Sequence, residues 1–201
     1  SKHPLLLTRG VPGTHDIQLM VNLFKKVKKS TFRSINIPKF DKSIDDRCKK
    51  NSWFKLKKKP DILILEGWCV GARAEGSRSL NRPINVLEKN ADKKKIWRSY
   101  VNNQLKSKYS KLFDQLDSLL YLKAKNFKLL KRWRLKQEKK LKMKSGTKKN
   151  SKIMNEKEVE TFMMTYQRIT QNMFKNAPKY SSAVIDLNEN HQIKKVKFNY
   201  A

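Results

Sequence analysis

The chain has few residues of the kinds that bind zinc or build a disulfide framework. Its 201 residues include two cysteines and three histidines, and Cys48 and Cys69 form no C-x-x-C pair. Zinc-site spacing is therefore absent. Disulfide scaffolds are normally shorter and richer in cysteine, so we expect two reduced thiols, although the sequence alone leaves a bond between them open.

Long apolar stretches are also missing. No run approaches the roughly 18 apolar residues that a membrane span requires, and the chain does not open with a charged segment followed by an apolar one. The pattern indicates neither a membrane segment nor an export signal. We therefore expect a cytoplasmic protein with no membrane partner.

Acidic residues are scarce, since 17 Asp and Glu face 48 Lys and Arg, for a formal charge of +31. Taken alone, this charge suggests a nucleic-acid partner, because cations neutralise phosphates and release counterions. Only 10 of the basic residues are Arg, however, and the lysines are spread over every segment. Nucleic-acid recognition tends to concentrate Arg and aromatic residues on one face. Nucleic acid is therefore the second choice of partner, after a nucleotide and an acidic small molecule.

The remaining composition and periodicity are those of one α/β domain. A length of 201 residues with 38% hydrophobic residues can bury a core. Residues 61–66 form a continuous apolar run ending in an acid, which is typical of a strand buried on both faces of a parallel sheet. Other elements are predicted as helices at 16–29, 92–116, 126–143 and around 159–173, and as strands at 34–40, 118–122, 183–187 and 192–198. The alternation indicates a mostly parallel sheet flanked by helices, with a loop at 72–90.

Three clusters place charged residues where the backbone is permissive, at 9–16, 41–47 and 66–71. In the first, a loop of glycine and proline runs into a helix that begins at Asp16, so free backbone N–H groups predict an anion site that Arg9 can strengthen. In the third, a carboxylate such as Glu66 after a buried strand commonly organises Mg²⁺ and water. Taken singly, a helix cap at Asp16 and a turn at Glu66 and Gly67 explain these residues better than a functional site does.

Taken together, the clusters resemble a known family. The strings RGVPGTHD, IPKFDKS followed by DDR, DILILEGWCVGAR, PINVLE and WRLKQE occur in this order between Pro4 and Leu187. They resemble the D-glycerate 3-kinase group, in the uridine kinase and phosphoribulokinase-like branch of P-loop kinases. The resemblance implies a single P-loop NTPase-type domain over 1–201, with a lid-like helical region at 126–175.

The resemblance also implies roles for individual residues. The acceptor substrate would be held by Arg9, Gly10, Gly13, Thr14, His15, Asp16, Asp41, Lys42 and Arg47. Glu66 would be the Walker-B-type acid that holds Mg²⁺ through water, and Arg134 would neutralise the transferring phosphoryl group from the lid helix. Nucleotide contacts would come from Gly67, Arg132, Gln137 and Glu138, although a solvated helix face explains Arg132 equally well.

Two motifs of this family are absent from the sequence. Neither G-x-x-x-x-G-K-S/T nor the Asp-Asp-Phe-Tyr segment occurs. We therefore expect this chain to be the C-terminal two thirds of a kinase, without the N-terminal P-loop strand. On its own it should bind little ATP and transfer little phosphate. The sheet should be incomplete between the strand that ends at Glu66 and the strand near Leu120.

The leading functional hypothesis is ATP- and Mg²⁺-dependent phosphorylation of a small hydroxy acid, D-glycerate first, by the whole protein. One alternative is a basic RNA-associated protein that uses the lysine-rich stretches at 49–59 and 139–152. Another is a degenerate nucleotide-binding pseudo-kinase that keeps the fold without the chemistry.

Overall fold

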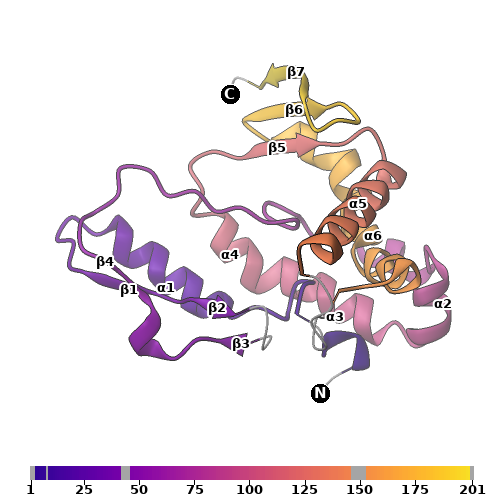
Figure 1. Cartoon of the computed structure of the whole chain (residues 1–201), viewed down its shortest axis with the longest axis horizontal. Helices are drawn as coiled ribbons and strands as arrows, with labels where there is room; N and C mark the ends of the chain where they lie inside the picture. The colour runs from indigo at the N-terminus through magenta and orange to yellow at the C-terminus, as the bar shows by residue number, and fades with distance from the viewer. Residues whose placement is uncertain (1–2, 8, 42–45, 146–152, 200–201) are drawn as a thin grey trace.

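The computed structural model describes residues 3–7, 9–41, 46–145 and 153–199 (Figure 1). The helices are α1 (Ile17–Lys28), α2 (Val86–Ala91), α3 (Ile96–Gln104), α4 (Ser110–Phe113), α5 (Phe127–Ser145) and α6 (Glu156–Tyr180). The strands are β1 (Ile35–Ile37), β2 (Phe40–Asp41), β3 (Asp46–Arg47), β4 (Phe54–Leu56), β5 (Leu120–Lys123), β6 (Ala183–Leu187) and β7 (Ile193–Phe198). Three short 3₁₀ helices cover Pro4–Leu6, Lys50–Ser52 and Ser77–Asn81, and a π-helical turn, Leu105–Tyr109, joins α3 to α4.

The largest sheet has the strand order β5, β6, β7 and lies beside α5 and α6 (Figure 1). β5 pairs parallel with β6, with Leu120 opposite Ala183, and β6 pairs antiparallel with β7. The strand predicted at 183–187 and its hairpin partner at 192–198 are confirmed. Helices packed on a sheet with a parallel pair confirm the α/β class, and β5 with β6 is the parallel pairing in the described part of the chain.

The prediction of a buried strand at 61–66 is wrong for this structure. The segment is drawn as coil between β4 and Trp68, and none of its residues forms a backbone hydrogen bond within the described ranges. Ile62 and Ile64 are 78% and 80% exposed. A residue run this apolar is stable as a strand only when neighbouring strands cover it and pair with its backbone.

A groove of about 1060 Å³ separates this segment from β5. Ile62 and Leu65 line one side, and Leu120 and Leu122, which are also largely exposed, line the other. β5 is an edge strand whose second edge has no partner in the described sheet. The incomplete sheet expected at this place is therefore confirmed.

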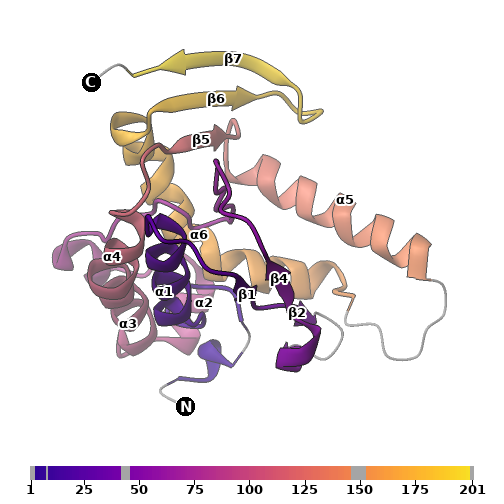
Figure 2. The same cartoon turned by 90° about the vertical axis from the view of Figure 1, so that its left-hand side faces the viewer.

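The core lies between α1, α3, α4 and α6 (Figure 2). In α1, Ile17, Val21 and Phe24 recur at helical spacing and are buried, and the Asp16 carboxylate caps the helix by accepting from the Leu19 N–H at 3.1 Å. The predicted helix at 16–29 is confirmed. α6 supplies a second buried face, and Figure 2 shows α5 extending away from this core.

The helix predicted at 92–116 begins later, at Ile96, because Asp92 acts as a cap. The Asp92 carboxylate accepts from the backbone N–H groups of Trp97 and Arg98 at 2.8 and 3.1 Å. The loop predicted at 72–90 is interrupted by the 3₁₀ helix Ser77–Asn81 and by the start of α2. Asn85 caps α2 by accepting from the Glu88 N–H, so a local cap that the prediction did not use starts this helix.

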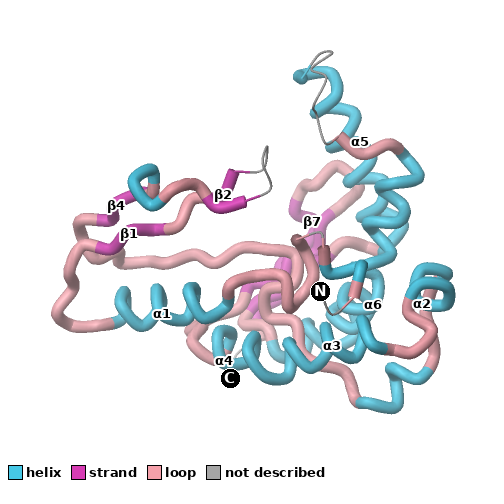
Figure 3. Tube along the Cα trace, turned by 90° about the horizontal axis from the view of Figure 1, so that it is seen from below, coloured by secondary structure: helices cyan, strands magenta, loops and turns pink. Residues whose placement is uncertain are grey.

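The strand predicted at 34–40 divides into two short pieces. β1 pairs antiparallel with β4, and β2 pairs antiparallel with β3, so neither joins the β5–β6–β7 sheet. Seen from below, these small sheets lie alongside α1 (Figure 3). Both cysteines are free, and Cys69 is buried, which raises its pKa to about 12. No helix in the described ranges is both long and apolar enough to cross a membrane.

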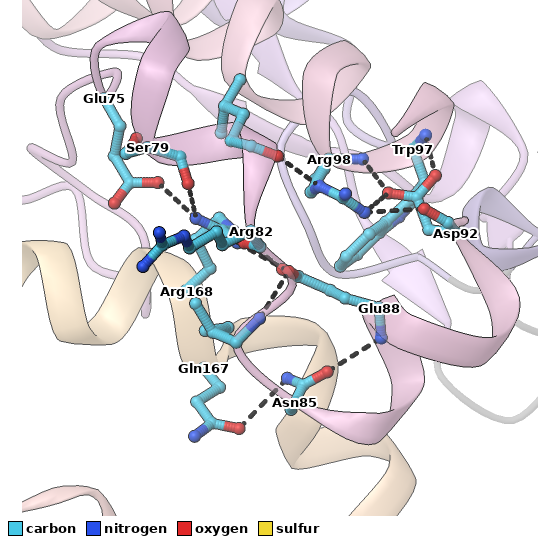
Figure 4. Close-up of polar contacts among 12 residues, drawn as sticks. Glu75, Ser79, Arg82, Asn85, Glu88, Asp92, Trp97, Arg98, Gln167 and Arg168 are labelled. Carbon is cyan, nitrogen blue, oxygen red and sulfur yellow. Dashed lines mark hydrogen bonds and ion pairs between the residues drawn. The ribbon is translucent and has the colours of Figure 1, made fainter. Parts of the chain in front are cut away.

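A buried ion network fixes residues 75–92 to α6 (Figure 4). Arg168 donates from Nε and Nη2 to the two carboxylate oxygens of Glu88, at 2.8 and 2.6 Å, and from Nη1 to Glu75 at 3.2 Å. Glu88 is fully buried. Burial alone lowers the pKa of Arg168, but the bonds and charges of Glu88 and Glu75 outweigh it and raise the pKa, so the guanidinium stays charged.

We predict that Glu88→Gln lowers the free energy of unfolding by about 3–5 kcal/mol, because it leaves the Arg168 charge buried without its main partner. Glu160→Gln is the matched control, since Glu160 is half-exposed and pairs with Lys131 at the surface, and it should cost no more than about 1 kcal/mol. Urea unfolding of the two variants measures the difference. Equal losses would show that the network does not stabilise the fold.

Candidate active site

The loop at 9–16 is closed by its own hydrogen bonds. The Gly10 N–H donates to the Thr14 hydroxyl at 2.8 Å, and that hydroxyl donates to the Val11 carbonyl at 2.8 Å. The Gly13 N–H donates to the Tyr109 hydroxyl at 3.0 Å, with Gly13 in the left-handed region at φ 101°. The prediction that this loop offers free N–H groups to an anion is therefore wrong at Gly10, Gly13 and Thr14, whose own N–H donates to Val11.

His15 lies near the end of this loop and is partly buried. Its Nδ1 lies 2.7 Å from the Tyr109 hydroxyl. Burial, with a smaller contribution from the Arg9 charge, lowers the pKa of His15, so the ring is neutral near pH 7. Nδ1 can then accept a hydrogen bond from the Tyr109 hydroxyl. Burial also raises the pKa of Tyr109 to about 12, which keeps that proton in place.

The β2–β3 hairpin covers the loop from the other side. Arg47 donates from Nη1 to the Asp16 carboxylate at 3.1 Å, and the Arg9 guanidinium lies 4.0 Å above the centre of the Phe40 ring. Asp41 follows Phe40 and is half-buried. Two predicted clusters, 9–16 and 41–47, are thus brought together, while Lys42 lies outside the described residues.

Glu66 and Gly67 lie at the rim of the groove, and both are exposed. The following residue, Trp68, anchors them by donating from its indole nitrogen to the Thr170 hydroxyl on α6 at 2.8 Å. A turn closes behind it, with Gly71 at φ 76° and in close contact with Leu119. Glu66 therefore lines the groove two residues before the anchored Trp68.

Arg134 is held on one face of α5. Its Nη2 pairs with Glu138 at 2.5 Å, its Nη1 donates to Gln137 at 2.8 Å, and its guanidinium lies 5.0 Å from the centre of the Phe162 ring. The Nε atom is buried and has no hydrogen-bond partner in the part of the chain that the structure describes. The i, i+3 and i, i+4 spacing predicted from sequence places these three residues side by side.

Arg132 points elsewhere. It pairs with Glu189, in the turn between β6 and β7, at 2.7 Å, and this hydrogen bond is the main cause that lowers the pKa of Glu189. Its neighbour Trp133 donates to the Glu189 carbonyl at 2.9 Å and stacks on His191. Arg132 therefore serves a surface attachment of α5 that is separate from the Arg134 group.

Tyr166 of α6 joins the separate clusters. Its ring lies 4.8 Å from that of Trp68 and 5.0 Å from that of Phe162, which Arg134 covers. Its hydroxyl comes so close to Gly10 that a Cβ atom there would lie 2.1 Å from it. The 9–16 loop, Trp68 after Glu66, and Phe162 under Arg134 thus lie around one side chain.

Known proteins similar to this chain include named kinases. No protein-family model matches the chain. The chain is similar to the uncharacterized kinase mug58 of Schizosaccharomyces pombe, with 32% identity over 82% of this chain and 58% of the relative. It is also similar to the chloroplastic D-glycerate 3-kinase of Arabidopsis thaliana, with 24% identity over 67% of this chain and 28% of the relative. A solved D-glycerate 3-kinase from Cryptococcus neoformans var. grubii matches with a TM-score of 0.78 and 22% identity, covering 98% of this chain and 71% of that one.

These matches confirm the resemblance to the D-glycerate 3-kinase group. At 22% identity and a TM-score of 0.78, the structural match establishes a shared α/β fold. The chain spans 58% and 28% of the lengths of the two curated relatives.

Sequence reasoning missed the aromatic residues of this candidate site. Tyr109 and Tyr166 lie on apolar faces of their helices, but their hydroxyls reach the 9–16 loop. A buried tyrosine on an apolar face carries a polar group that must meet a partner or a hollow, and this is the only signal that the sequence holds.

We predict that His15 makes stability depend on pH. Because the pKa of His15 in the folded chain lies below its ordinary value of 6.5, the contribution of the neutral ring is fully present above pH 6.5 and is lost as the pH falls through the lowered pKa. When the pH falls from 7.5 to 5, the free energy of unfolding of the His15→Gln variant should therefore decrease less than that of the wild type. Urea midpoints across this range test it, with His191→Gln as the control, and identical pH profiles for His15→Gln and the wild type would refute the role of His15.

Proposed function

We propose that this chain forms the acceptor and lid portion of an ATP-dependent kinase that phosphorylates the hydroxyl of a small hydroxy acid, with D-glycerate as the first substrate to test. The observation that carries the proposal is the meeting of the 9–16 loop, Glu66 with Trp68, and Arg134 around Tyr166. The names of the relatives, two D-glycerate 3-kinases and one kinase, support the same reaction class.

The groove between Ile62 and Leu120 is the place that we propose for a P-loop strand. Its walls are apolar, its volume is about 1060 Å³, and both sides carry exposed residues that a strand would cover. The 201 residues hold no G-x-x-x-x-G-K-S/T motif that could cradle phosphates. The proposal therefore assigns nucleotide binding to the whole kinase, with Gly67 at the rim of the site.

Glu66 fits the role of a magnesium-associated acid. No cluster of three or more His, Cys, Asp or Glu side chains suited to a metal occurs among the described residues, so this part of the chain builds no all-protein cage. Mg²⁺ in kinases needs only one or two carboxylates, with water and phosphate oxygens completing its shell. When bound, Mg-ATP supplies the phosphoryl group, and Glu66 would hold the ion through water at the groove rim.

Arg134 is the candidate for stabilising the transferring phosphoryl group. Its guanidinium is already oriented by Glu138 and by the Phe162 ring, and an oriented cation loses little entropy when it binds an anion. Because Nη1 and Nη2 are engaged by Gln137 and Glu138, catalysis requires the guanidinium to exchange or share those partners. On the acceptor side, Arg9 is an exposed cation of the loop that contains His15, and its charge contributes to lowering the pKa of that histidine.

ATP consumption with D-glycerate and Mg²⁺ tests the proposal, measured for this chain and for the longest product of its gene. We expect turnover only from a product that carries a P-loop, since positioning of the phosphates supplies most of the catalysis. Absence of turnover with any small hydroxy acid would refute the kinase proposal. Tight retention of RNA in that case would favour the RNA-associated alternative, and ATP binding without turnover would favour the pseudo-kinase.

The same assay separates the two lid arginines. Arg134→Ala should lower kcat at least about 100-fold with little change in the KM for the acceptor, because the lost contact forms in the transition state. Arg132→Ala, the matched control two residues away, should keep kcat within about threefold, since Arg132 pairs with Glu189. An unchanged kcat for Arg134→Ala would remove Arg134 from the mechanism.

A further inference from the structure

A second hollow, of about 470 Å³, lies between the 9–16 loop and the first turns of α6. Arg9, Gly10 and Val11 line one side, and Lys157 and Tyr166 line the other. Two cations thus border a space large enough for a small acid. Glu158 also lines it, but its carboxylate is engaged by the Asn155 N–H in the capping box of α6, at 2.7 Å.

The ring of Tyr166 is fixed, but its hydroxyl is not used by the fold. Tyr166 is 6% exposed and packs between Trp68 and Phe162. Its hydroxyl forms no hydrogen bond with any residue in the described ranges. Burial raises the pKa of Tyr166 above its ordinary value, so the hydroxyl remains protonated and able to donate at neutral pH. A donor held in place at the wall of a hollow, without a protein acceptor, is arranged for a ligand.

Gly10 keeps open the space that this hydroxyl occupies. A Cβ atom at Gly10 would lie 2.1 Å from the Tyr166 oxygen but 3.2 Å from the ring carbon that bears it. Among the described residues, the glycines in the left-handed region are Gly13 and Gly71. Gly10 does not lie in that region, so its backbone conformation does not require glycine. The absence of a side chain at position 10 therefore makes room mainly for the hydroxyl, although the ring carbon at 3.2 Å would also have to shift by a few tenths of an ångström to admit a methyl group.

A purely structural role does not explain this pairing. Phenylalanine at position 166 would make the same contacts with Trp68 and Phe162 and would leave no donor unpaired. Phenylalanine would also relieve the restriction on Gly10. The hydroxyl is thus the one part of this side chain that packing does not account for.

We propose that Tyr166 is a substrate-binding residue that donates from its hydroxyl to the carboxylate of the acceptor, in the hollow bordered by Arg9 and Lys157. This inference rests on the proposed function and names the residue that would recognise the carboxylate of the small hydroxy acid, as distinct from the hydroxyl to be phosphorylated. Hydrogen bonds to a carboxylate are charge-assisted, so this one contributes to affinity and to selection against uncharged polyols.

Calorimetric binding of D-glycerate to the 201-residue chain tests the proposal, with glycerol as the ligand that lacks the carboxylate. Tyr166→Phe should weaken D-glycerate binding about tenfold, the value of one charge-assisted hydrogen bond, while its urea midpoint stays at or above that of the wild type. Tyr180→Phe is the matched control on the same helix. Its hydroxyl donates to the Gly71 carbonyl, so its loss should lower stability and leave D-glycerate affinity unchanged.

A double variant separates binding from packing. Gly10→Ala should lower both stability and D-glycerate affinity, because the new methyl group displaces the hydroxyl. Adding Tyr166→Phe should restore most of the stability, because only the smaller clash with the ring carbon remains, but should not restore the affinity. Restored affinity in the double variant, or wild-type affinity in Tyr166→Phe, would overturn the role of Tyr166 and leave the proposed function standing. No binding of D-glycerate by the wild type would instead overturn the proposed acceptor site and this inference with it.

Discussion

The unpaired edge of β5, opposite the exposed segment 62–65, is the constraint on which the account of this molecule depends. Backbone groups and apolar side chains in these two stretches need a further strand to satisfy them, and the groove between them has room for one. The remaining core does not need that strand, because α1, α3, α4 and α6 bury one another's apolar faces. The fold is therefore ordered around an open position, with Glu66 at its rim.

Helix α6 connects this open position to the proposed acceptor side. Arg168 on one face fixes the 75–92 segment through Glu88, and Tyr166, two residues earlier, contacts Trp68 and approaches Gly10. A rigid helix that is anchored by a buried ion network can hold a substrate-binding side chain within the tolerance that catalysis requires. Stability and the candidate site are thus linked through neighbouring residues of one helix.

The sequence predicted elements whose causes are local and missed those whose causes are distant. The Asp16 cap with the α1 periodicity, and the strand at 183–187, were correct because each depends on neighbouring residues or on a partner within the chain. Residues 61–66 failed as a strand because pairing requires neighbours that the described chain does not place there. The prediction of free N–H groups in the 9–16 loop was wrong because the hydroxyls of Thr14 and of the distant Tyr109 accept hydrogen bonds from them. In the site, the spacing of Arg134, Gln137 and Glu138 on a helix predicted that these residues lie side by side. The approach of Tyr166 to Gly10 could not be predicted, because the two residues are over 150 positions apart in the sequence.

Amide hydrogen exchange on this chain tests the open strand position most directly. The account predicts that the N–H groups of residues 62–65 exchange at rates near those of an unstructured peptide, while those of Val184 and Ile185 in β6 exchange orders of magnitude more slowly. In a gene product that supplies a P-loop strand, residues 62–65 should become protected. Protection of residues 62–65 equal to that of β6 in the 201-residue chain alone would contradict the account.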